Sequence, residues 1–584
     1  MNLPKFMRLV DTELESMSEQ ELKSCLRELA RTLPENDRTH FLSIIDNRSG
    51  IVKQDSDEEK LLKKKVEDII SVLEEIGEGE RCLASEYNEE WDDWYNSDDD
   101  EVFFSDPEKI VPDFITAIRL IHECVDTESY TEGYKLAKVL SSISIFADGD
   151  WDDYCGDSLG IKDLYEHELI VGLFDKLVAE SLYLTYMAKE SRARASEIYT
   201  MMGNFDCNDL RLEDVMQIGN HSLPEFNTFL SDWITLLGAH NDWRTKRLLK
   251  EAVSMIQDEY QALNVARTHA VTHPELFKQI LETGESDADP IKLFRIGTEA
   301  LDKIPDNLTI RGEIALLTAN YAGRINTLPG VELCWLEAFR SDSSVVNYLR
   351  IRFLTRVWKD YAKQVEDIIE SEYAKTLSRS KSIDTYNREY ILNENALYKN
   401  DYCTLLFWEK KFDEVFNLGL CEKQMLGWSS TFMKQGLAMF MLILYESEKY
   451  QSGLQSMARL AVSGCKLNAD DYYKGTCDLE HKDSYSLFME LFTNLKMELD
   501  VSEDDKIKWL DKIGKIIEKR VVAIMEAERR NYYGECASFI AAFGEVIESR
   551  GQKEAKQSLM MSYKAKYPRR RSFIQALKNY GFRA

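Results

Sequence analysis

Two acidic segments that contain tryptophan are the places where the residue types of this chain could do chemistry. Residues 86–106 carry ten carboxylates and no base, and residues 148–157 read DGDWDDYCGD. Carboxylates at this density attract a basic partner or a divalent cation, and the interleaved aromatic residues supply area that a protein partner can bury. The candidate partner-binding residues in these segments are Trp91, Asp92, Asp93, Trp94, Tyr95, Trp151, Asp152, Asp153 and Tyr154.

The second segment has the alternating acids of a calcium-binding loop but lacks the rest of that motif. Asp148, Asp150 and Asp152 occupy alternate positions. The sixth position is Asp153 where an EF-hand needs glycine, and the twelfth is Leu159 where it needs glutamate. We therefore do not assign an EF-hand.

Other spacings that could hold a metal or a nucleophile are incomplete. His269 and His273 are four residues apart, but Ala270 stands where a zinc protease has its glutamate, and Pro274 ends the helix. No GxxxxGKS/T, GxGxxG or GxSxG motif occurs. We expect no catalytic residue, no metal site and no cofactor. A metal-dependent enzyme acting through the acidic patches is the alternative.

The C-terminal segment reverses the charge of the chain. The whole chain has 103 acids against 73 bases and a net charge of −30, which disfavours nucleic-acid binding across its surface. Residues 564–584, by contrast, carry seven bases and no acid. Three of these bases are candidate contacts: Arg569, Arg570 and Arg571. Because Phe573 and Leu577 keep helical spacing, we expect the tail to pack, and its bases to dock on this protein or a partner rather than on nucleic acid.

The elements that must position these residues read as helices. Apolar residues make up 44% of the 584, there are only ten prolines, and regularly spaced strands are absent from the pattern. The clearest stretch is 291–353, where several short amphipathic helices follow one another. The first has its apolar face at Leu293, Ile296, Gly297, Ala300, Leu301 and Ile304. Helices this short must stack on neighbours, and Trp335, Phe339 and Tyr348 are predicted core residues.

Composition shifts divide the chain into four predicted segments. The polar stretch 282–290, which ends in proline, is the best candidate boundary. A long helix is expected near 345–377, and the apolar run within 426–447 predicts a buried helix. The four segments are 1–58, N-terminal helical with a hinge; 59–285, helical repeats carrying both acidic-aromatic loops; 286–465, central helical repeats; and 466–584, C-terminal helical with the basic tail.

The cysteines and the apolar runs predict a cytoplasmic protein. Eleven cysteines are scattered along the chain, an odd number that suits free thiols in a reducing compartment. The N-terminus lacks the apolar region of a signal peptide, and the longest apolar run, 437–445, is too short to cross a bilayer. We expect no membrane association.

Several stretches resemble a known kind of protein. CWLEAFRSDSSVVNYLRI (334–351), LGWSSTFMKQGLAMFMLILY (426–445), YYGECASFIAAFGEVIESRG (532–551) and YPRRRSFIQAL (567–577) are similar to uncharacterised bacterial helical-repeat, tetratricopeptide-like proteins. They also resemble the helical region that accompanies SWIM zinc fingers, and the N-terminal LKSCLRELARTLPENDRTHFLSII is loosely similar too. The finger itself needs a CxC motif, which this chain lacks, so its zinc site does not carry over. The resemblance implies a superhelical repeat scaffold.

Together these features predict an all-α fold, a superhelical array of antiparallel helix pairs of degenerate TPR-like or HEAT-like α-solenoid type. The function we expect is a non-catalytic scaffold or adaptor that binds a protein or peptide partner, and the acidic loops would suit a basic one. Besides the metal-dependent enzyme, a nucleic-acid-associated accessory or regulatory protein in a bacterial stress or defence pathway is an alternative, acting through the basic tail.

Overall fold

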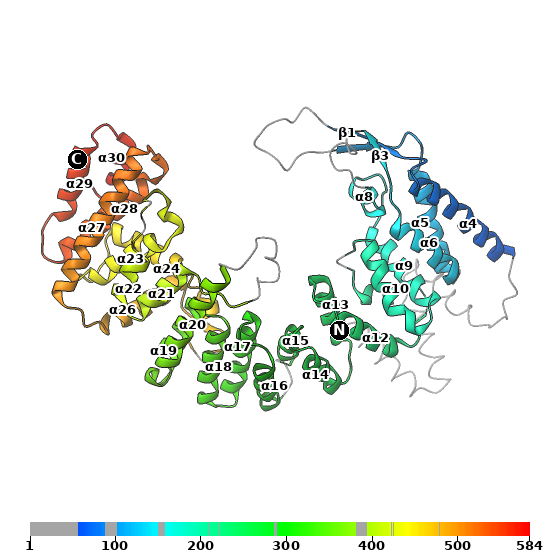
Figure 1. Ribbon diagram of the computed structural model, residues 1–584, viewed down its shortest axis with the longest axis horizontal. Coiled ribbons are helices and arrows are strands. Elements are labelled where there is room, and N and C mark those ends of the chain that lie inside the picture. The colour runs from blue at the N-terminus through cyan, green and yellow to red at the C-terminus, as the bar shows by residue number, and fades with distance from the viewer. Residues whose placement is uncertain are drawn as a thin grey trace, which may run out of the picture. The chain divides into compact units, whose positions relative to one another are not determined.

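The described residues fold almost wholly as α-helices, with one small β-sheet (Figure 1). The computed structural model describes residues 57–87, 102–149, 158–207, 210–219, 221–284, 289–380, 394–421, 423, 425–477 and 479–583. The predicted all-α fold class is confirmed. Nearly all of the predicted N-terminal segment, residues 1–56, lies outside the described residues.

The chain forms two compact units, Met1–Val265 and Ala266–Ala584. The division falls inside a helix, α14, and precedes the polar stretch 282–290 where the sequence suggested a boundary. Helices and strands of the first unit, in chain order and up to the boundary helix, are α4 (Asp57–Gly77), β1 (Leu83–Tyr87), β2 (Val102–Ser105), α5 (Val111–Asp126), α6 (Tyr130–Ser142), β3 (Ala147–Gly149), α8 (Ile161–Glu166), α9 (Phe174–Ala188), α10 (Ser191–Asn204), α11 (Leu212–Met216), α12 (Phe226–Gly238), α13 (Trp243–Ser254) and α14 (Glu259–Thr268).

Helices α5 and α6 form a tight pair that packs on α9. Gly133 of α6 allows the close approach, because a Cβ atom there would lie 2.7 Å from Leu184 and 2.9 Å from Cys124. Burial of the apolar faces of α5 and α6, including Phe114 and Leu136, provides the core of this layer.

The sheet of the first unit has the strand order β2-β1-β3. Strand β1 runs antiparallel to β2 and parallel to β3. The sequence predicts loops between helices in this region, so the sheet is a difference from that prediction. Strands of five, four and three residues are too short to show a period of two, and an acidic run separates the first two.

The second unit contains only helices among its described elements. They are α15 (Glu275–Thr283), α16 (Pro290–Lys303), α17 (Thr309–Arg324), α18 (Leu328–Ser341), α19 (Val345–Leu354), η3 (Trp358–Asp360), α20 (Ala362–Ser380), α21 (Lys399–Trp408), α22 (Phe412–Leu418), η5 (Met425–Ser430), α23 (Phe432–Leu444), α24 (Ser452–Gly464), α25 (Ala469–Tyr473), α26 (Ser484–Met497), α27 (Glu503–Glu526), η6 (Arg530–Tyr532), α28 (Tyr533–Ser549), α29 (Ala555–Lys566) and α30 (Arg571–Asn579).

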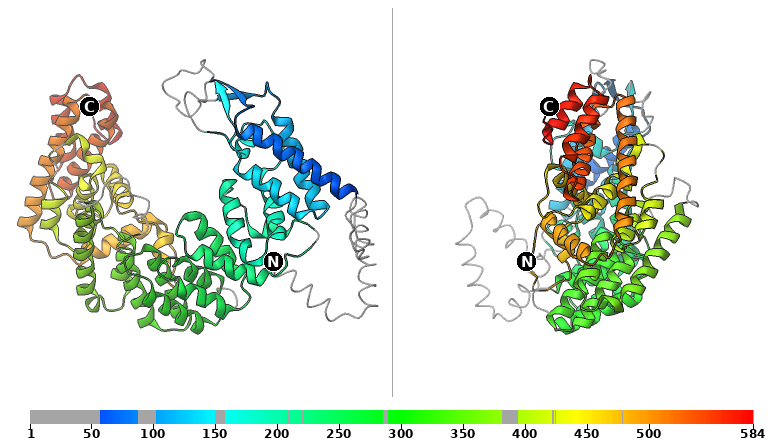
Figure 2. Two further views of the ribbon diagram at one scale, coloured as in Figure 1. Left: turned by 45° about the vertical axis from the view of Figure 1, so that its right-hand side comes forward. Right: turned by 90° about the vertical axis from the view of Figure 1, so that its left-hand side faces the viewer.

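The stretch 291–353 folds as its periodicity predicts. Helices α16, α17 and α18 pack one on the next, and Figure 2 shows them, in green, side by side. The predicted apolar face of α16 is buried, as are the predicted core residues Trp335, Phe339 and Tyr348. The apolar helix α23 is also buried as expected, since every residue of it except Lys434 is inaccessible. Local spacing was sufficient for these predictions.

The prediction of one long helix near 345–377 is wrong. Helix α19 ends at Leu354 and α20 begins at Ala362, with the short helix η3 between them. Glu332 of α18 holds the break, since its carboxylate accepts hydrogen bonds from the Arg356 backbone N–H at 2.9 Å and from the Tyr361 hydroxyl at 3.1 Å. These are tertiary contacts, which helix periodicity along the chain does not reveal.

Four buried arginines donate to backbone carbonyl groups, and three of them, Arg194, Arg311 and Arg350, do so at the C-terminal ends of helices. The last turn of a helix leaves carbonyl oxygens without intrahelical partners, and the guanidinium group offers five donors in a rigid fork. Arg311 donates to the Leu301 carbonyl near the end of α16 at 3.0 and 2.9 Å. Arg194 donates to the carbonyls of Tyr186 and Lys189 at the end of α9 at 3.0 and 3.1 Å.

The other two arginines join elements far apart in the sequence. Arg350 of α19 donates to the Tyr472 carbonyl at 2.9 Å and to the Asp471 carbonyl, both in α25. Arg520 of α27 donates to the carbonyls of Met425 and Leu426 in η5. All four arginines are at most 7% exposed, so the carbonyls they bind have little water to replace them.

We predict that Arg350→Met lowers the free energy of unfolding of the second unit by about 3 kcal/mol, because it leaves buried carbonyl groups unpaired. Thermal and urea denaturation followed by circular dichroism measure this loss. Arg350→Lys should recover only part of it, since an ammonium group lacks the fork. The control is Arg340→Met on the half-exposed surface of α18, and equal losses in the two methionine variants would contradict the role of Arg350.

Candidate partner-binding surface

The sheet of the first unit brings the ends of two distant strands together. Because β1 and β3 are parallel, both finish at the same end of the sheet, after Tyr87 and Gly149 respectively. Gly149 lies opposite Ser85, two residues before the end of β1. Standard strand spacing and rise place the Cα atoms of Tyr87 and Gly149 about 8 Å apart. The two acidic-aromatic segments, 88–101 and 150–157, therefore follow neighbouring strand ends, although residues 102–149 separate them in the sequence.

Hydrogen bonds to the chain before α5 fix the sheet on the helices. Arg81 donates to the Asp113 carboxylate at 2.8 Å and to the backbone carbonyls of Glu108 and Lys109 at 2.9 Å. The Cys82 backbone N–H donates to the Glu108 carboxylate at 2.8 Å. Asp106, just after β2, accepts from two backbone N–H groups at the start of α5. The strands are thus attached at the end opposite to the acidic segments.

The two faces of the sheet differ in exposure. Leu83, Ser85 and Ala147 point to one face and are buried. The alternate residues point to the other face, which is exposed: Glu86, Phe103, Ser105, Phe146 and Asp148. We call these five residues the open sheet face. Phe103 and Phe146 are 53% and 45% exposed, which is high for phenylalanine.

The open sheet face combines apolar area with negative charge. Glu86 lies directly opposite Phe103 across the β1–β2 ladder, and Asp148 lies opposite Ala84 across the β1–β3 ladder. A cross-strand neighbour of this kind is close enough for a single ligand side chain to contact both members. A segment carrying lysine or arginine among apolar residues matches this surface in charge and in polarity.

The predicted residues of the acidic segments lie outside the described residues. These are Trp91, Asp92, Asp93, Trp94, Tyr95, Trp151, Asp152, Asp153 and Tyr154. What the structure adds to them is the position of the strands from which their segments continue. Of the open sheet face, Glu86 and Phe103 belong to the acidic-aromatic segment 86–106, and Asp148 belongs to the calcium-like spacing. No alternation of polar and apolar residues at 83–87 signals this surface, because β1 reads LASEY.

The basic tail docks on its own chain. Helix α30 packs on α28, and the predicted packing residues Phe573 and Leu577 are fully buried. Arg570 donates to the Glu528 carboxylate at 2.8 Å, and the Lys566 ammonium lies 3.1 Å from the Glu518 carboxylate. Arg569 and Arg571 are exposed. The tail therefore uses part of its charge on carboxylates of α27 and the turn that follows.

His269 and His273, the two histidines at helical spacing, lie between the end of α14 and the start of α15. Their ring centroids are 5.9 Å apart, and His273 Nδ1 lies 3.1 Å from the Glu275 carboxylate. Burial lowers the pKa of His269.

No cluster of three or more histidine, cysteine or acidic side chains with metal-binding geometry occurs among the described residues. Within that same part of the chain, no helix is both long and apolar enough to span a bilayer.

No protein-family model matches this chain, and no curated protein is similar to it. The geometry of the described surfaces is therefore the basis for a functional proposal.

Glu251 of α13 is a half-buried acid that contacts the first turn of α11. Its carboxylate accepts a hydrogen bond from the Glu213 backbone N–H, at 3.3 Å, in the first turn of α11. Its second oxygen, Oε2, is buried without a hydrogen-bond partner in the described structure. Burial raises the pKa of Glu251 to about 7. This carboxyl group caps a helix.

We predict that Glu251→Gln stabilises the first unit at pH 8 relative to the wild type, and that this gain shrinks as the pH falls to 5. The folded-state pKa lies above the usual value for glutamate, so ionisation between the two values costs stability that the amide does not lose. The expected difference between the two pH values is about 2 kcal/mol. Melting curves across this range measure it. Glu190→Gln, at an exposed site, is the control, and a pH-independent effect of Glu251→Gln would contradict the account.

Proposed function

We propose that this chain is a non-catalytic, cytoplasmic protein–protein interaction scaffold whose partner presents a basic segment to the first unit. In this proposal the helices form degenerate TPR-like or HEAT-like pairs, of the kind found in bacterial helical-repeat proteins. The consecutive packing of α16 on α17 and of α17 on α18 supports a repeat arrangement. Several buried charged side chains form hydrogen bonds with backbone groups at the ends of helices. This supports a structural use of these side chains and not a catalytic one.

The single observation that carries the proposal is the parallel pairing of β1 with β3. This pairing starts both acidic-aromatic segments at one end of the same sheet. It also creates the open sheet face beside them. A partner that binds at this end would contact strands that are remote in sequence, which is a common way to build a specific interface.

The energetics favour a basic, partly apolar partner. Covering the half-exposed rings of Phe103 and Phe146 contributes about 1 kcal/mol each, roughly half the value for full burial. The negative field of a chain with net charge −30 increases the association rate of a cationic partner. Glu86 and Asp148 then select lysine or arginine at defined positions.

The basic tail gives the nucleic-acid alternative little support. Lys566 and Arg570 already pair with Glu518 and Glu528. A phosphate backbone would have to displace these carboxylates while approaching an acidic chain. No described contact favours the metal-dependent enzyme over the scaffold.

We predict that a fluorescent peptide of alternating lysine and leucine binds the full chain, and that two separate sets of substitutions weaken this binding about tenfold or more. One set is Trp91→Ala, Trp94→Ala and Trp151→Ala. The other is Glu86→Gln, Phe103→Ser and Asp148→Asn. Fluorescence anisotropy measures the dissociation constants, which should rise with salt because the contacts are ionic.

The control for these sets is Trp243→Ala, which removes a tryptophan that is 61% exposed elsewhere in the first unit. It should change the affinity less than twofold. Equal affinity for a peptide of glutamate and leucine, or wild-type binding by both substituted proteins, would refute the proposed surface.

A further inference from the structure

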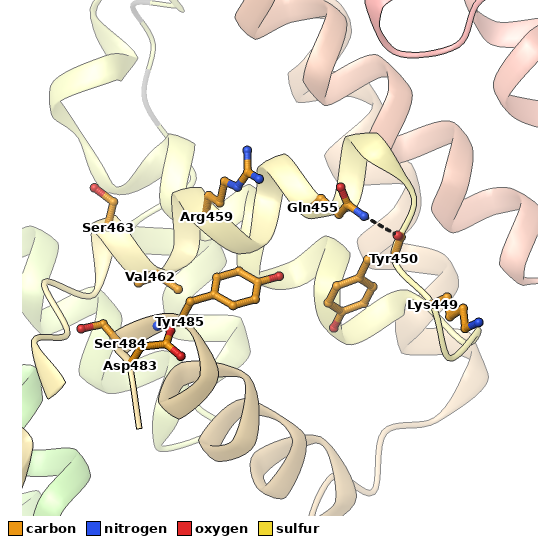
Figure 3. A pocket seen from close by; sticks show the side chains of 9 residues that line it. All are labelled: Lys449, Tyr450, Gln455, Arg459, Val462, Ser463, Asp483, Ser484 and Tyr485. Atoms are coloured by element: carbon orange, nitrogen blue, oxygen red, sulfur yellow. Dashed lines mark hydrogen bonds between the residues drawn. The ribbon is translucent and has the colours of Figure 1, made fainter. Parts of the chain in front are cut away.

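The second unit contains an open groove of about 970 Å³ between α24 and the start of α26. Figure 3 shows its side chains, with Arg459 and Gln455 on α24 and Tyr485 in the first turn of α26. The turn that follows α23 adds Lys449 and Tyr450. The size is within the range of grooves that hold a ligand or several residues of a peptide.

The two positively charged side chains of the groove have no carboxylate partner among the described residues. The Arg459 and Lys449 side chains are exposed, and neither makes an ion pair or a side-chain hydrogen bond with another described residue. This is notable in a chain with 103 acids, because other cations of the same unit pair with carboxylates, as Lys466 does with Asp401 and Lys482 with Glu490. An anionic ligand would supply the partner that the chain itself does not.

The one carboxylate among the described residues that line the groove is already engaged. Asp483 caps α26, accepting from the backbone N–H groups of Tyr485 and Ser486 at 3.0 Å and from the Ser486 hydroxyl at 2.5 Å. These hydrogen bonds keep the pKa of Asp483 below its usual value. The carboxylate therefore neutralises helix-end dipoles more than it neutralises Arg459.

Two tyrosines add apolar area and hydroxyl donors to the positive charge of the groove. Tyr485 is 39% exposed, and Tyr450 is half-buried next to Tyr445, with ring centroids 5.5 Å apart. Burial raises the pKa of Tyr450 to about 12, and its hydroxyl, neutral at physiological pH like that of any ordinary tyrosine, can donate a hydrogen bond. Gln455 is turned toward the same place, since its side-chain amide donates to the Tyr450 carbonyl at 3.1 Å (Figure 3). The rings offer apolar area, and their hydroxyls offer donors.

We propose that this groove binds an extended acidic peptide segment of a partner protein, whose carboxylates pair with Arg459 and Lys449 and whose apolar side chains pack on Tyr450 and Tyr485. Charge complementarity identifies the occupant. Single-stranded nucleic acid also combines anions with rings, but it carries a charge on every phosphate, and the two cations of this groove are too few to hold such a backbone. This groove and the open sheet face would select partners of opposite charge, and the two proposals stand independently.

The test uses the full chain and a fluorescent decapeptide of alternating glutamate and tyrosine, with a lysine–tyrosine decapeptide as the charge-reversed probe. We expect the acidic peptide to bind in preference to the basic one at this groove. Lys449→Gln with Arg459→Gln should weaken binding of the acidic peptide at least tenfold, and Tyr485→Ala at least threefold, as measured by fluorescence anisotropy. Tyr485→Phe should retain most of the affinity, because it keeps the ring.

The matched control is Lys508→Gln with Lys515→Gln, which removes the same charge from α27 at two side chains that are each 68% exposed. It should change the affinity less than twofold. Equal effects of the two double variants would show that only net charge matters and would overturn the proposal. Tighter binding of a single-stranded oligonucleotide, or full competition by millimolar inorganic phosphate or free glutamate, would overturn it in favour of a nucleic-acid or simple anion site.

Discussion

The hydrogen bonds from buried guanidinium groups to helix-end carbonyls are the interaction on which both units depend. An array of short helices has many ends, and each end leaves carbonyl oxygens that must find donors when neighbouring helices cover them. Arg194, Arg311 and Arg350 supply those donors inside the protein, and the buried Arg520 donates to two carbonyls at the start of η5. Arg350 and Arg520 do so between elements about one hundred residues apart, and so they fix which helices are neighbours. The acidic composition of the chain does not reveal that buried arginines have this structural role.

This use of the buried charges moves the functional question to the surface. Arg520 pairs with Glu535, and Lys556 pairs with Glu545, whose carboxylate also caps α24 through the backbone N–H groups of Gly453 and Leu454. Groups engaged in this way stabilise the fold and have no remaining capacity for a ligand. The open sheet face and the groove beside Arg459 are two described surfaces that combine charge with exposed aromatic area. The first carries carboxylates and the second carries two cations beside one engaged carboxylate.

The success of prediction from sequence depended on how local each feature is. The buried faces of α16 and α23 follow from spacing within one helix, and the structure confirms them. The sheet depends on pairing Leu83 with Ala147, which no local pattern contains. The break after Leu354 depends on Glu332 in another helix. The groove was missed for the same reason, because Arg459 and Tyr485 are brought together across a segment that looks like a polar insertion. Among the predicted site residues, Arg569, Arg570 and Arg571 lie within the described part of the chain. For the acidic segments, composition could predict only their negative charge and their aromatic content.

Hydrogen–deuterium exchange of the full chain, with and without the saturating lysine–leucine peptide, tests the central claim most directly. The account predicts added protection at residues 83–87, 102–105 and 145–149, because a ligand on the open sheet face shields these strands and suppresses their local opening. Exchange in α16–α18 should stay unchanged. Protection confined to other helices, or no change in the three strands at saturating peptide, would contradict the claim that this sheet presents the partner-binding surface.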